Sequence, residues 1–336
     1  MRIGLNPNKD QPTEESIYLH HIVVPVYIPN QEGYFKDSLR ILKLCIGSLL
    51  NTIHSKTFIS VLNNGSCSDV KEYLELLFND GKIQEVIHTE NIGKLNAIIK
   101  GLVGNNIELV TITDADVLFL PNWQNETIKV FSKIPKAGVV GIVPQFKMYE
   151  SNCGNVVFDN LSSKKLKFLP VKNPMALERF YESIGWDKSY NKDYLKYNLG
   201  LKINTELNVL IGSGHFVATY KKEIFQETTS FIGYKLGGIS ETYLDKAPLK
   251  KGYWRLTTQD NYAYHMGNRI EDWMETDNKQ NNKEDDIILN FSINKKPGKF
   301  SYYLKNRIFV KFISIPIFNW LFLKLKGLPK QMIKRY

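Results

Sequence analysis

The sequence predicts an α/β protein with a mostly parallel central sheet, helices on both faces of that sheet, and a basic C-terminal helical extension. Short apolar runs alternate with longer segments of helical periodicity between residues 21 and 150. Strands that alternate with helices of ten or more residues are typical of βαβ units and a parallel sheet. The stretch after Asp286 differs in composition, because it contains eleven basic residues and no acidic residue.

Each element of the predicted sheet follows from a local pattern. Nearly continuous apolar runs predict buried strands, and apolar residues spaced three or four apart predict helices. The predicted strands span residues 21–28, 58–66, 83–89, 109–117 and 138–146. The predicted helices between these strands span residues 35–53, 70–78, 94–103 and 122–134.

Composition predicts how the whole chain is divided. Residues 1–19 form a polar lead-in, and residues 20–270 are expected to form the main domain, with halves at 20–145 and 146–270. Residues 271–286 are expected to be an exposed acidic loop. Residues 287–336 are expected to be a basic amphipathic extension.

The positive charge of the chain belongs to the extension. The net charge is +10, and subtracting the eleven basic residues after Asp286 leaves −1 for residues 1–286. A nearly neutral domain argues against nucleic acid as a partner, and the basic extension favours contact with something anionic. The first sixteen residues are polar and the three cysteines have no paired spacing, so we expect a cytoplasmic protein with reduced thiols.

Two carboxylates stand at the end of the fourth predicted strand, in the segment TDADV. In an extended chain Asp114 and Asp116 would face the same side, and Ala115 would point back into the fold. Ligands of open α/β sheets bind beyond the carboxyl ends of the strands. Paired carboxylates there suit Mg²⁺ or Mn²⁺, which also bind phosphate oxygens. The alternative is a solvated turn that precedes a helix.

Four segments in this order resemble the family-2 glycosyltransferases of the GT-A fold, a nucleotide-binding, Rossmann-like α/β domain. They are VVPVY (Val23–Tyr27), LNNGSCSD (Leu62–Asp69), NIGKLNAIIKGL (Asn91–Leu102) and TDADVLFLPNW (Thr113–Trp123). The resemblance implies an inverting transfer of a sugar from a nucleotide-diphosphate sugar to a glycan or lipid-linked acceptor, as in bacterial surface polysaccharide synthesis. It also implies that residues 20–145 bind the nucleotide and that residues 146–270 bind the acceptor.

The same resemblance implies a set of site residues. Asp116, Asp114 and His265 would hold Mn²⁺ or Mg²⁺, although His265 also fits an ordinary hydrogen-bonded histidine at a strand end. The implied contacts with the nucleotide sugar are Pro25, Val26, Tyr27, Asn63, Asn64, Lys94, Asn96, Asp114 and Ala115. Asn63 stands where the family often has an acid, and Lys94 also fits a solvated lysine at a helix start.

The family also places a catalytic acid at the start of a later helix, about eleven residues before a glycine. Glu241 matches this position, because Gly252 follows eleven residues later. Glu241 would accept the proton of the acceptor hydroxyl, and Asp245, one turn later, is the competing candidate. An acid in the first turn of a helix is also favoured by the helix dipole alone.

The apolar part of the extension, Ile308–Leu325, is eighteen residues long and is interrupted by Lys311, Pro316, Asn319 and Lys324. A membrane span needs about twenty largely uncharged residues. We therefore expect a segment that lies at the anionic inner face of the cell membrane. The alternatives are packing on the domain's own flank and a true span.

Two other functions compete with sugar transfer. A nucleotidyltransferase would also combine a βαβ domain with carboxylates and a metal, but it would normally carry a Gly-rich basic loop after the first strand, where this chain has VPVYIPNQEG. The second competitor is a membrane-associated binding protein that keeps the fold without transfer activity. The incomplete motif around Glu241 is the reason to consider it.

Overall fold

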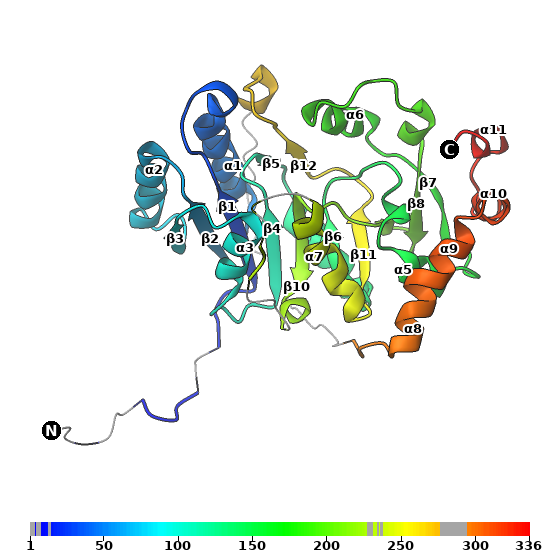
Figure 1. The fold of residues 1–336 in the computed structure, drawn as a ribbon, viewed down its shortest axis with the longest axis horizontal. Coiled ribbons are helices and arrows are strands. Elements are labelled where there is room, and N and C mark those ends of the chain that lie inside the picture. The colour runs from blue at the N-terminus through cyan, green and yellow to red at the C-terminus, as the bar shows by residue number, and fades with distance from the viewer. Residues whose placement is uncertain are drawn as a thin grey trace.

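The computed structural model describes residues 4, 8–12, 15–226, 231–233, 235, 238–275 and 294–336, with the side chains of residues 238–241 left out. Within these residues, ten strands form one sheet in the order β3-β2-β1-β4-β10-β6-β11-β9-β8-β7. Figure 1 shows β3 and β2 at one end of the molecule and β8 and β7 at the other, beside the C-terminal helices. The remaining strands, β5 and β12, pair with each other in a second, small sheet.

The strands of the large sheet are β1 (His20–Val26), β2 (Thr57–Asn64), β3 (Glu85–Thr89), β4 (Leu109–Thr113), β6 (Ala137–Gly141), β7 (Leu166–Pro170), β8 (Tyr197–Lys202), β9 (Asn208–Ile211), β10 (Val217–Lys221) and β11 (Trp254–Thr258). The small sheet consists of β5 (Val117–Phe119) and β12 (Ala263–His265). The main helices of the domain are α1 (Ser38–Thr52), α2 (Ser68–Asn79), α3 (Lys94–Leu102), α4 (Trp123–Lys133), α5 (Gly154–Asp159), α6 (Pro174–Ser183) and α7 (Gly238–Lys250).

The large sheet is mostly parallel in strand direction. The pairs β1–β2, β2–β3, β1–β4 and β6–β11 are parallel. Among the strands of this sheet that the structure describes, β10, β9 and β7 run against the other seven, as their antiparallel pairings show. The predicted α/β architecture with a mostly parallel sheet is therefore confirmed.

Strand β1 is buried on both faces, as expected for a central parallel strand. Ile22 and Val24 pack into one apolar cluster together with residues of α1 and α2. Val23 packs into a second cluster together with residues of α3 and α7. Helix α3 lies very close to the sheet at Gly101, where an added Cβ would lie 2.7 Å from the Leu62 side chain. Two helical layers therefore cover opposite faces of the sheet.

The elements predicted for residues 21–146 are all present, with ends that differ by a few residues. Residues 151–210, which show little pattern in the sequence, contain α5, β7, α6, β8 and β9. The strands among them continue the central sheet with antiparallel pairings.

Only residues 271–275 of the predicted exposed acidic loop can be compared with the structure, and Glu271, Asp272 and Glu275 are exposed there. Asp272–Glu275 form a 3-10 helix in which Met274 is buried in the first apolar cluster. Glu275 also forms an ion pair with Arg40 of α1. Residues 276–286 lie outside the described residues.

The extension is helical, as predicted, from Lys299 onward. It consists of α8 (Lys299–Tyr303), a π-helical turn at Leu304–Ile308, α9 (Phe309–Ile313), α10 (Pro316–Leu325) and α11 (Lys330–Ile333). One side of it packs on the domain, since the amide of Phe168 in β7 donates to the Lys326 carbonyl at 2.8 Å. Seven of its apolar side chains are buried with residues of the sheet: Phe309, Phe322, Leu323, Leu328, Met332, Ile333 and Tyr336.

Candidate active site

A cleft of about 350 Å³ opens where β1, β2 and β4 end. Parallel neighbours bring their carboxyl ends to the same edge of a sheet, which is where ligands of such folds bind. The loops after β1 and β2 are joined by a hydrogen bond of 3.0 Å from the Ile28 amide to the Ser66 hydroxyl. The cleft is lined by Pro25 and Val26 at the end of β1, Tyr27 just after it, Asn64 of β2, and Lys94 of α3, all of them predicted site residues.

Asp114, Ala115 and Asp116 line the same cleft. They do not form an extended strand as predicted, because the chain turns at residues 115 and 116 between β4 and β5. The turn is held at both ends: the Asp114 amide donates to the Phe216 carbonyl at 2.7 Å, and the Met266 amide donates to the Asp116 carbonyl at 2.8 Å. Both carboxylates therefore reach the cleft from a fixed turn, and Ala115 lines it too instead of pointing only into the core.

Lys94 provides positive charge beside the first carboxylate. Its Nζ atom lies 2.5 Å from Oδ1 of Asp114, and about a quarter of each side chain is exposed. Lys94 is the first residue of α3 and follows Gly93, which has a φ of +89° that glycine adopts readily. Its backbone amide donates to the Lys235 carbonyl at 2.9 Å. The sharp entry into α3 thus places the lysine at the cleft.

His265 provides the partner of the second carboxylate. Its Nε2 atom lies 3.4 Å from Oδ2 of Asp116, and its Nδ1 atom lies 3.0 Å from the hydroxyl of Ser183 at the end of α6. The antiparallel pairing of β12 with β5 sets His265 opposite Val117 and therefore next to Asp116. These contacts place His265 beside Asp116, and the joint metal-binding role of Asp114, Asp116 and His265 stays a prediction.

The Asp116 carboxylate lacks enough partners for its charge. Burial raises the pKa of Asp116, and the neighbouring Asp114 raises it further, against the opposing effects of His265 and Lys94. Its Oδ1 atom is buried and has no hydrogen-bond partner among the described residues. A buried carboxylate oxygen without a donor is costly unless a cation or another partner meets it.

The residues present fit a hard divalent cation. Carboxylate oxygens are preferred ligands of Mg²⁺ and Mn²⁺, and such ions are often held by one or two carboxylates together with substrate phosphates. In the part of the chain that the structure describes, no group of three His, Cys, Asp or Glu side chains is arranged to hold a metal by itself. Asp114, Asp116 and His265 would therefore need diphosphate oxygens to complete a coordination shell.

Three asparagines of the predicted set occupy different places. Asn64 lines the cleft, and its Oδ1 atom accepts from the Ile92 amide at 2.9 Å. Asn63 is buried and is not among the lining residues; its amide group bonds to His88 at 2.8 Å and its oxygen accepts from the Ser66 amide. Asn96 likewise lies outside the lining, and its side chain bonds to backbone groups of Ile92 and Ile232.

The two candidate bases lie in α7. Glu241 is in the first turn of that helix, and its side chain lies outside the described residues. Asp245 is not among the cleft residues, and its Oδ1 atom lies 2.5 Å from Nη2 of the buried Arg255. Arg255 also donates to the Ser213 carbonyl at 2.6 Å. These contacts indicate a structural role for Asp245.

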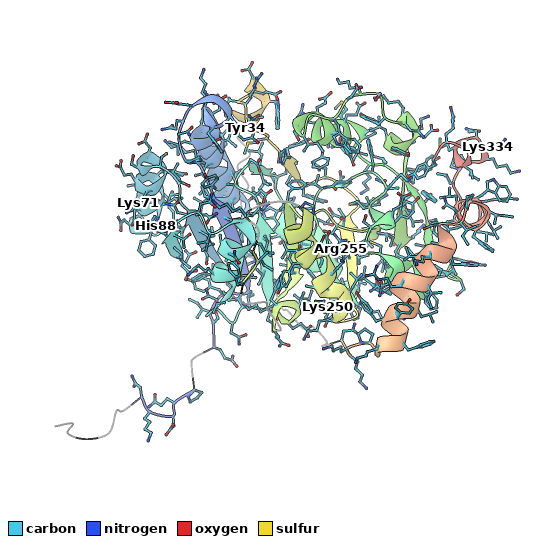
Figure 2. The ribbon with its side chains drawn as sticks, viewed as in Figure 1. Tyr34, Lys71, His88, Lys250, Arg255 and Lys334 are labelled. Carbon is cyan, nitrogen blue, oxygen red and sulfur yellow. The ribbon has the colours of Figure 1, made fainter. Side chains whose placement is uncertain are left out.

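Aromatic side chains at the mouth of the cleft were not predicted as site residues. Tyr34 and Phe35 line it from the turn before α1, and Tyr34 is 69% exposed. Figure 2 shows Tyr34 at the outer edge of the domain, above the ends of the parallel strands. Asn268 also lines the cleft and donates to the Tyr34 carbonyl at 3.2 Å. The sequence signal for Tyr34 and Phe35 is an adjacent aromatic pair where the predicted helix 35–53 begins.

Comparison with known proteins identifies one matching family and several solved structures of low sequence identity. The model of glycosyl transferase family 2 matches residues 22–225. No curated protein matches the chain. The chain is similar to S. aureus TarS 1–349 in complex with UDP-GlcNAc, at 13% identity and a TM-score of 0.44 over 77% of this chain and 61% of that one.

Two further solved structures are similar at the same level. The mannosyltransferase PcManGT from Pyrobaculum calidifontis, in complex with GDP-Man and Mn²⁺, matches at 16% identity and a TM-score of 0.44, over 76% of this chain and 61% of that one. GalNAc-T7 with UDP, GalNAc and Mn²⁺ matches at 13% identity and a TM-score of 0.47, over 75% and 44%.

This chain spans about 60% of the length of the first of these structures. The identities and TM-scores are low, so the assignment depends on the family model. That model covers more than half of the chain, and the chain therefore belongs to glycosyl transferase family 2.

Proposed function

We propose that this chain is an inverting, metal-dependent glycosyltransferase that moves a sugar from a nucleotide-diphosphate sugar to the hydroxyl group of a glycan or lipid-linked acceptor. The observation that carries the proposal is the state of Asp116 in the cleft. Its Oδ1 atom is buried without a partner among the described residues, and the Asp114 carboxylate and the His265 imidazole lie beside it. A site of this charge suits a donor that arrives with a divalent cation.

In this proposal the donor's diphosphate lies between the ends of β1 and β4. Asp116, Asp114 and His265 would hold Mn²⁺ or Mg²⁺, whose chemistry when bound is to neutralise charge that develops on the departing diphosphate. Lys94 adds a second positive charge at the same point, because its ammonium already lies against Asp114. Tyr27 and Tyr34 present aromatic surface at the mouth of the cleft, where a nucleobase can stack.

Glu241 is our candidate for the general base. It lies in the first turn of α7, where the helix dipole favours a carboxylate. In an inverting reaction it would take the proton from the acceptor hydroxyl as the oxygen attacks the anomeric carbon, while the nucleoside diphosphate leaves from the opposite face. Asp245 would act by positioning α7 through its pair with Arg255.

The proposed setting is the cytoplasmic face of the cell membrane, in synthesis of a surface polysaccharide of the bacterial type. The support is the basic extension, which has no acidic residue after Asp286. The extension packs beside β7 and β8, in the half of the domain that we assign to the acceptor. An acceptor carried by lipid would then meet the enzyme at that side.

The direct test is release of nucleoside diphosphate from a panel of sugar nucleotides in the presence of Mn²⁺. The proposal predicts release with at least one donor, and loss of release in the variant Asp116→Ala. Normal donor binding without release from any donor would favour a binding protein that lacks transfer activity. Pyrophosphate release from a nucleoside triphosphate and a sugar phosphate would instead indicate a nucleotidyltransferase.

A further inference from the structure

Helix α10 (Pro316–Leu325) is apolar on both of its faces. Phe322 and Leu323 are buried against the domain. The opposite face carries Ile317, Trp320, Leu321 and Leu325, all exposed and spaced three or four residues apart. A helix that is apolar all round normally has both faces covered, by protein or by lipid. The outer face of α10 therefore lacks a cover among the described residues.

The exposed apolar surface is concentrated in this part of the molecule. Twenty large apolar or aromatic side chains are exposed among the described residues, and nine of them lie between Phe300 and Leu325. The others are spread over the rest of the domain. Contiguous exposed apolar surface marks an interaction site more often than isolated exposed residues do.

The two helical stretches of this segment are long and apolar enough to cross a membrane only when they are taken together, and the chain bends sharply between them. In the described residues no single helix is long and apolar enough to cross a membrane. The stretches Lys299–Ile313 and Pro316–Leu325 meet at 97°. We call this right-angled pair of helical stretches, Lys299–Leu325, the wedge. Ile315 and Ile317 flank Pro316 at the corner of this wedge, and both are exposed.

The charge around the wedge indicates what covers it. Lys311 and Lys324 are exposed beside the apolar face, and the Lys324 ammonium lies 4.9 Å from the centre of the Trp320 ring. Figure 2 shows Lys334 at this end of the molecule and Lys71 at the other. Two copies meeting at this face would bring the exposed Lys311 and Lys324 of both copies together, and the extension has no acidic residue of its own to compensate them. Anionic lipid complements the face, and a second copy of the chain repels it.

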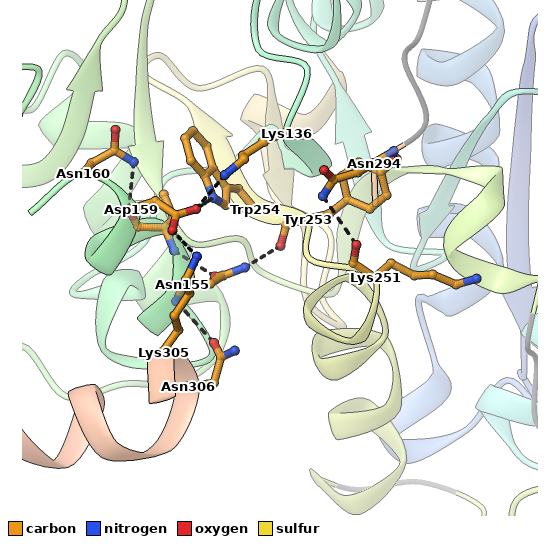
Figure 3. A network of polar contacts seen from close by, with 11 residues as sticks. Lys136, Asn155, Asp159, Asn160, Lys251, Tyr253, Trp254, Asn294, Lys305 and Asn306 are labelled. Carbon is orange, nitrogen blue, oxygen red and sulfur yellow. Dashed lines mark hydrogen bonds and ion pairs between the residues drawn. The ribbon is translucent and has the colours of Figure 1, made fainter. Parts of the chain in front are cut away.

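The wedge is fixed to the domain by a polar network, shown in Figure 3. The Lys305 ammonium lies 2.5 Å from Oδ1 of Asp159, whose other oxygen bonds to Lys136 at 2.9 Å. Next to this pair, the Asn155 amide donates to the side-chain oxygen of Asn306 at 3.2 Å. These bonds join the start of the wedge to α5, so insertion of the wedge would orient the whole domain.

We propose that the wedge inserts its outer face into an anionic lipid monolayer, with Ile315, Ile317, Trp320 and Leu321 in the acyl region. Lys311 and Lys324 lie at the level of the headgroups, where long basic side chains extend toward phosphate. The inference goes beyond the location proposed above, because it names the inserting face and the orientation that the fixed wedge imposes. It does not depend on sugar transfer.

The test uses the full chain and vesicles of phosphatidylcholine, with or without phosphatidylglycerol. We expect the chain to co-sediment with the anionic vesicles and to remain largely in solution with the neutral ones. The double variant Ile317→Ser/Leu321→Ser should lose at least about tenfold in partition coefficient, because two apolar side chains no longer insert. The matched control is Leu76→Ser/Phe78→Ser, which changes exposed apolar residues of α2 and should bind as the parent does.

A second pair of variants tests the charges. Lys311→Ala and Lys324→Ala should each lower binding to anionic vesicles by about fivefold, since a basic residue at the surface contributes about 1 kcal/mol. Lys71→Ala, on α2, is the control and should have no effect. Brominated acyl chains should quench part of the tryptophan fluorescence, and the variant Trp320→Phe should remove that quenching.

Three results would overturn the proposal. One is equal vesicle binding by Ile317→Ser/Leu321→Ser and by the parent, at equal melting temperatures. Another is unchanged quenching in Trp320→Phe. The third is a dimer, seen by light scattering, that the Ile317→Ser/Leu321→Ser change dissociates while vesicles remain unbound. Donor turnover without vesicles should be the same in all these variants, so a failure here is separable from a failure of the proposed function.

Discussion

The imidazole of His265 lies 3.4 Å from the carboxylate of Asp116, and its other ring nitrogen lies 3.0 Å from the hydroxyl of Ser183. Strands β5 and β12 create this contact between residues that are far apart in the sequence. The histidine therefore has one nitrogen directed at the proposed metal ligand and the other fixed by α6. This arrangement resembles metal-binding histidines whose second nitrogen is oriented by a hydrogen bond.

Replacing His265 should weaken metal binding more than folding. We expect His265→Ala to lower the affinity for Mn²⁺ and donor turnover by about tenfold or more, and Ser183→Ala to have a smaller effect of the same sign, because the ring loses its orientation. Titration calorimetry with Mn²⁺ and a non-hydrolysable donor measures the affinity. Unchanged Mn²⁺ affinity in His265→Ala would assign the histidine to structure alone.

Replacing Asp116 by its amide should stabilise the metal-free protein. The raised pKa of Asp116 means that the folded state binds this proton more tightly than the unfolded state does, so stability falls as the pH rises through that window. At neutral pH, Asp116→Asn should therefore melt about 1–2 °C above the parent. Mn²⁺ with a nucleoside diphosphate should raise the melting temperature of the parent but not that of the variant. A variant that is less stable and still responds to Mn²⁺ contradicts this prediction.

Lys94 should act mainly on donor binding. Its pair with Asp114 is partly exposed and contributes little to stability, whereas a bond from an ammonium to a diphosphate is worth more. We expect Lys94→Ala to raise the KM for the donor about tenfold, with only a small change in melting temperature. Lys100→Ala, on the exposed side of the same helix, serves as the control. Equal KM values in the parent and Lys94→Ala would exclude this role.

Variants of Glu241 and Asp245 should differ in what they change: the first should lower the reaction rate, and the second should lower the stability of the fold. Glu241→Gln should lower kcat by about 10²–10⁴-fold without a change in stability, because the base is lost and the shape is kept. Asp245→Asn should instead lower the free energy of unfolding by about 2 kcal/mol or more, since Arg255 is left buried without its counter-charge. Steady-state kinetics and thermal melts on both variants test this. A large loss of kcat in Asp245→Asn, with a loss of stability in Glu241→Gln, would make Asp245 the base.

Buried histidines should make the fold sensitive to acid. Burial lowers the pKa of His21 to about 3 and lowers that of His20 as well. Both side chains are fully buried, and His20 lies 2.6 Å from the Thr111 hydroxyl. The unfolded chain takes up these protons first, so stability is full above about pH 6.5 and declines below it, by up to about 1.4 kcal/mol per pH unit for each group. Melting curves between neutral and mildly acidic pH test this, and a flat profile would contradict it.

The parallel half of the fold was predictable because its signals are local. Each strand of residues 20–145 that joins the large sheet is a short apolar run, and each helix between them has its own periodicity. β5 and β12 were not predictable, because each has three residues and exists only through pairing with the other. The regular elements within 151–210 were missed for a related reason: β7, β8 and β9 are stabilised by extending the sheet and by contact with the extension.

The candidate site was predictable as a set of residue types, and less so in its geometry. Asp114, Asp116 and Lys94 were expected at one edge of the sheet, and they meet there. The prediction that the two aspartates lie in an extended strand was wrong, because they lie in a turn that hydrogen bonds to Phe216 and Met266 hold in place. No local pattern encodes hydrogen bonds to backbone groups so distant in the chain.

The central claim is that Asp116 holds a divalent cation against the leaving diphosphate. The most direct measurement is nucleoside diphosphate release by the parent and by Asp116→Ala, each titrated with Mn²⁺ at a saturating donor concentration. The account predicts that release by the parent rises with Mn²⁺ to a plateau, and that Asp116→Ala stays at the metal-free rate while it remains folded. A variant that follows the same Mn²⁺ curve as the parent would contradict the account.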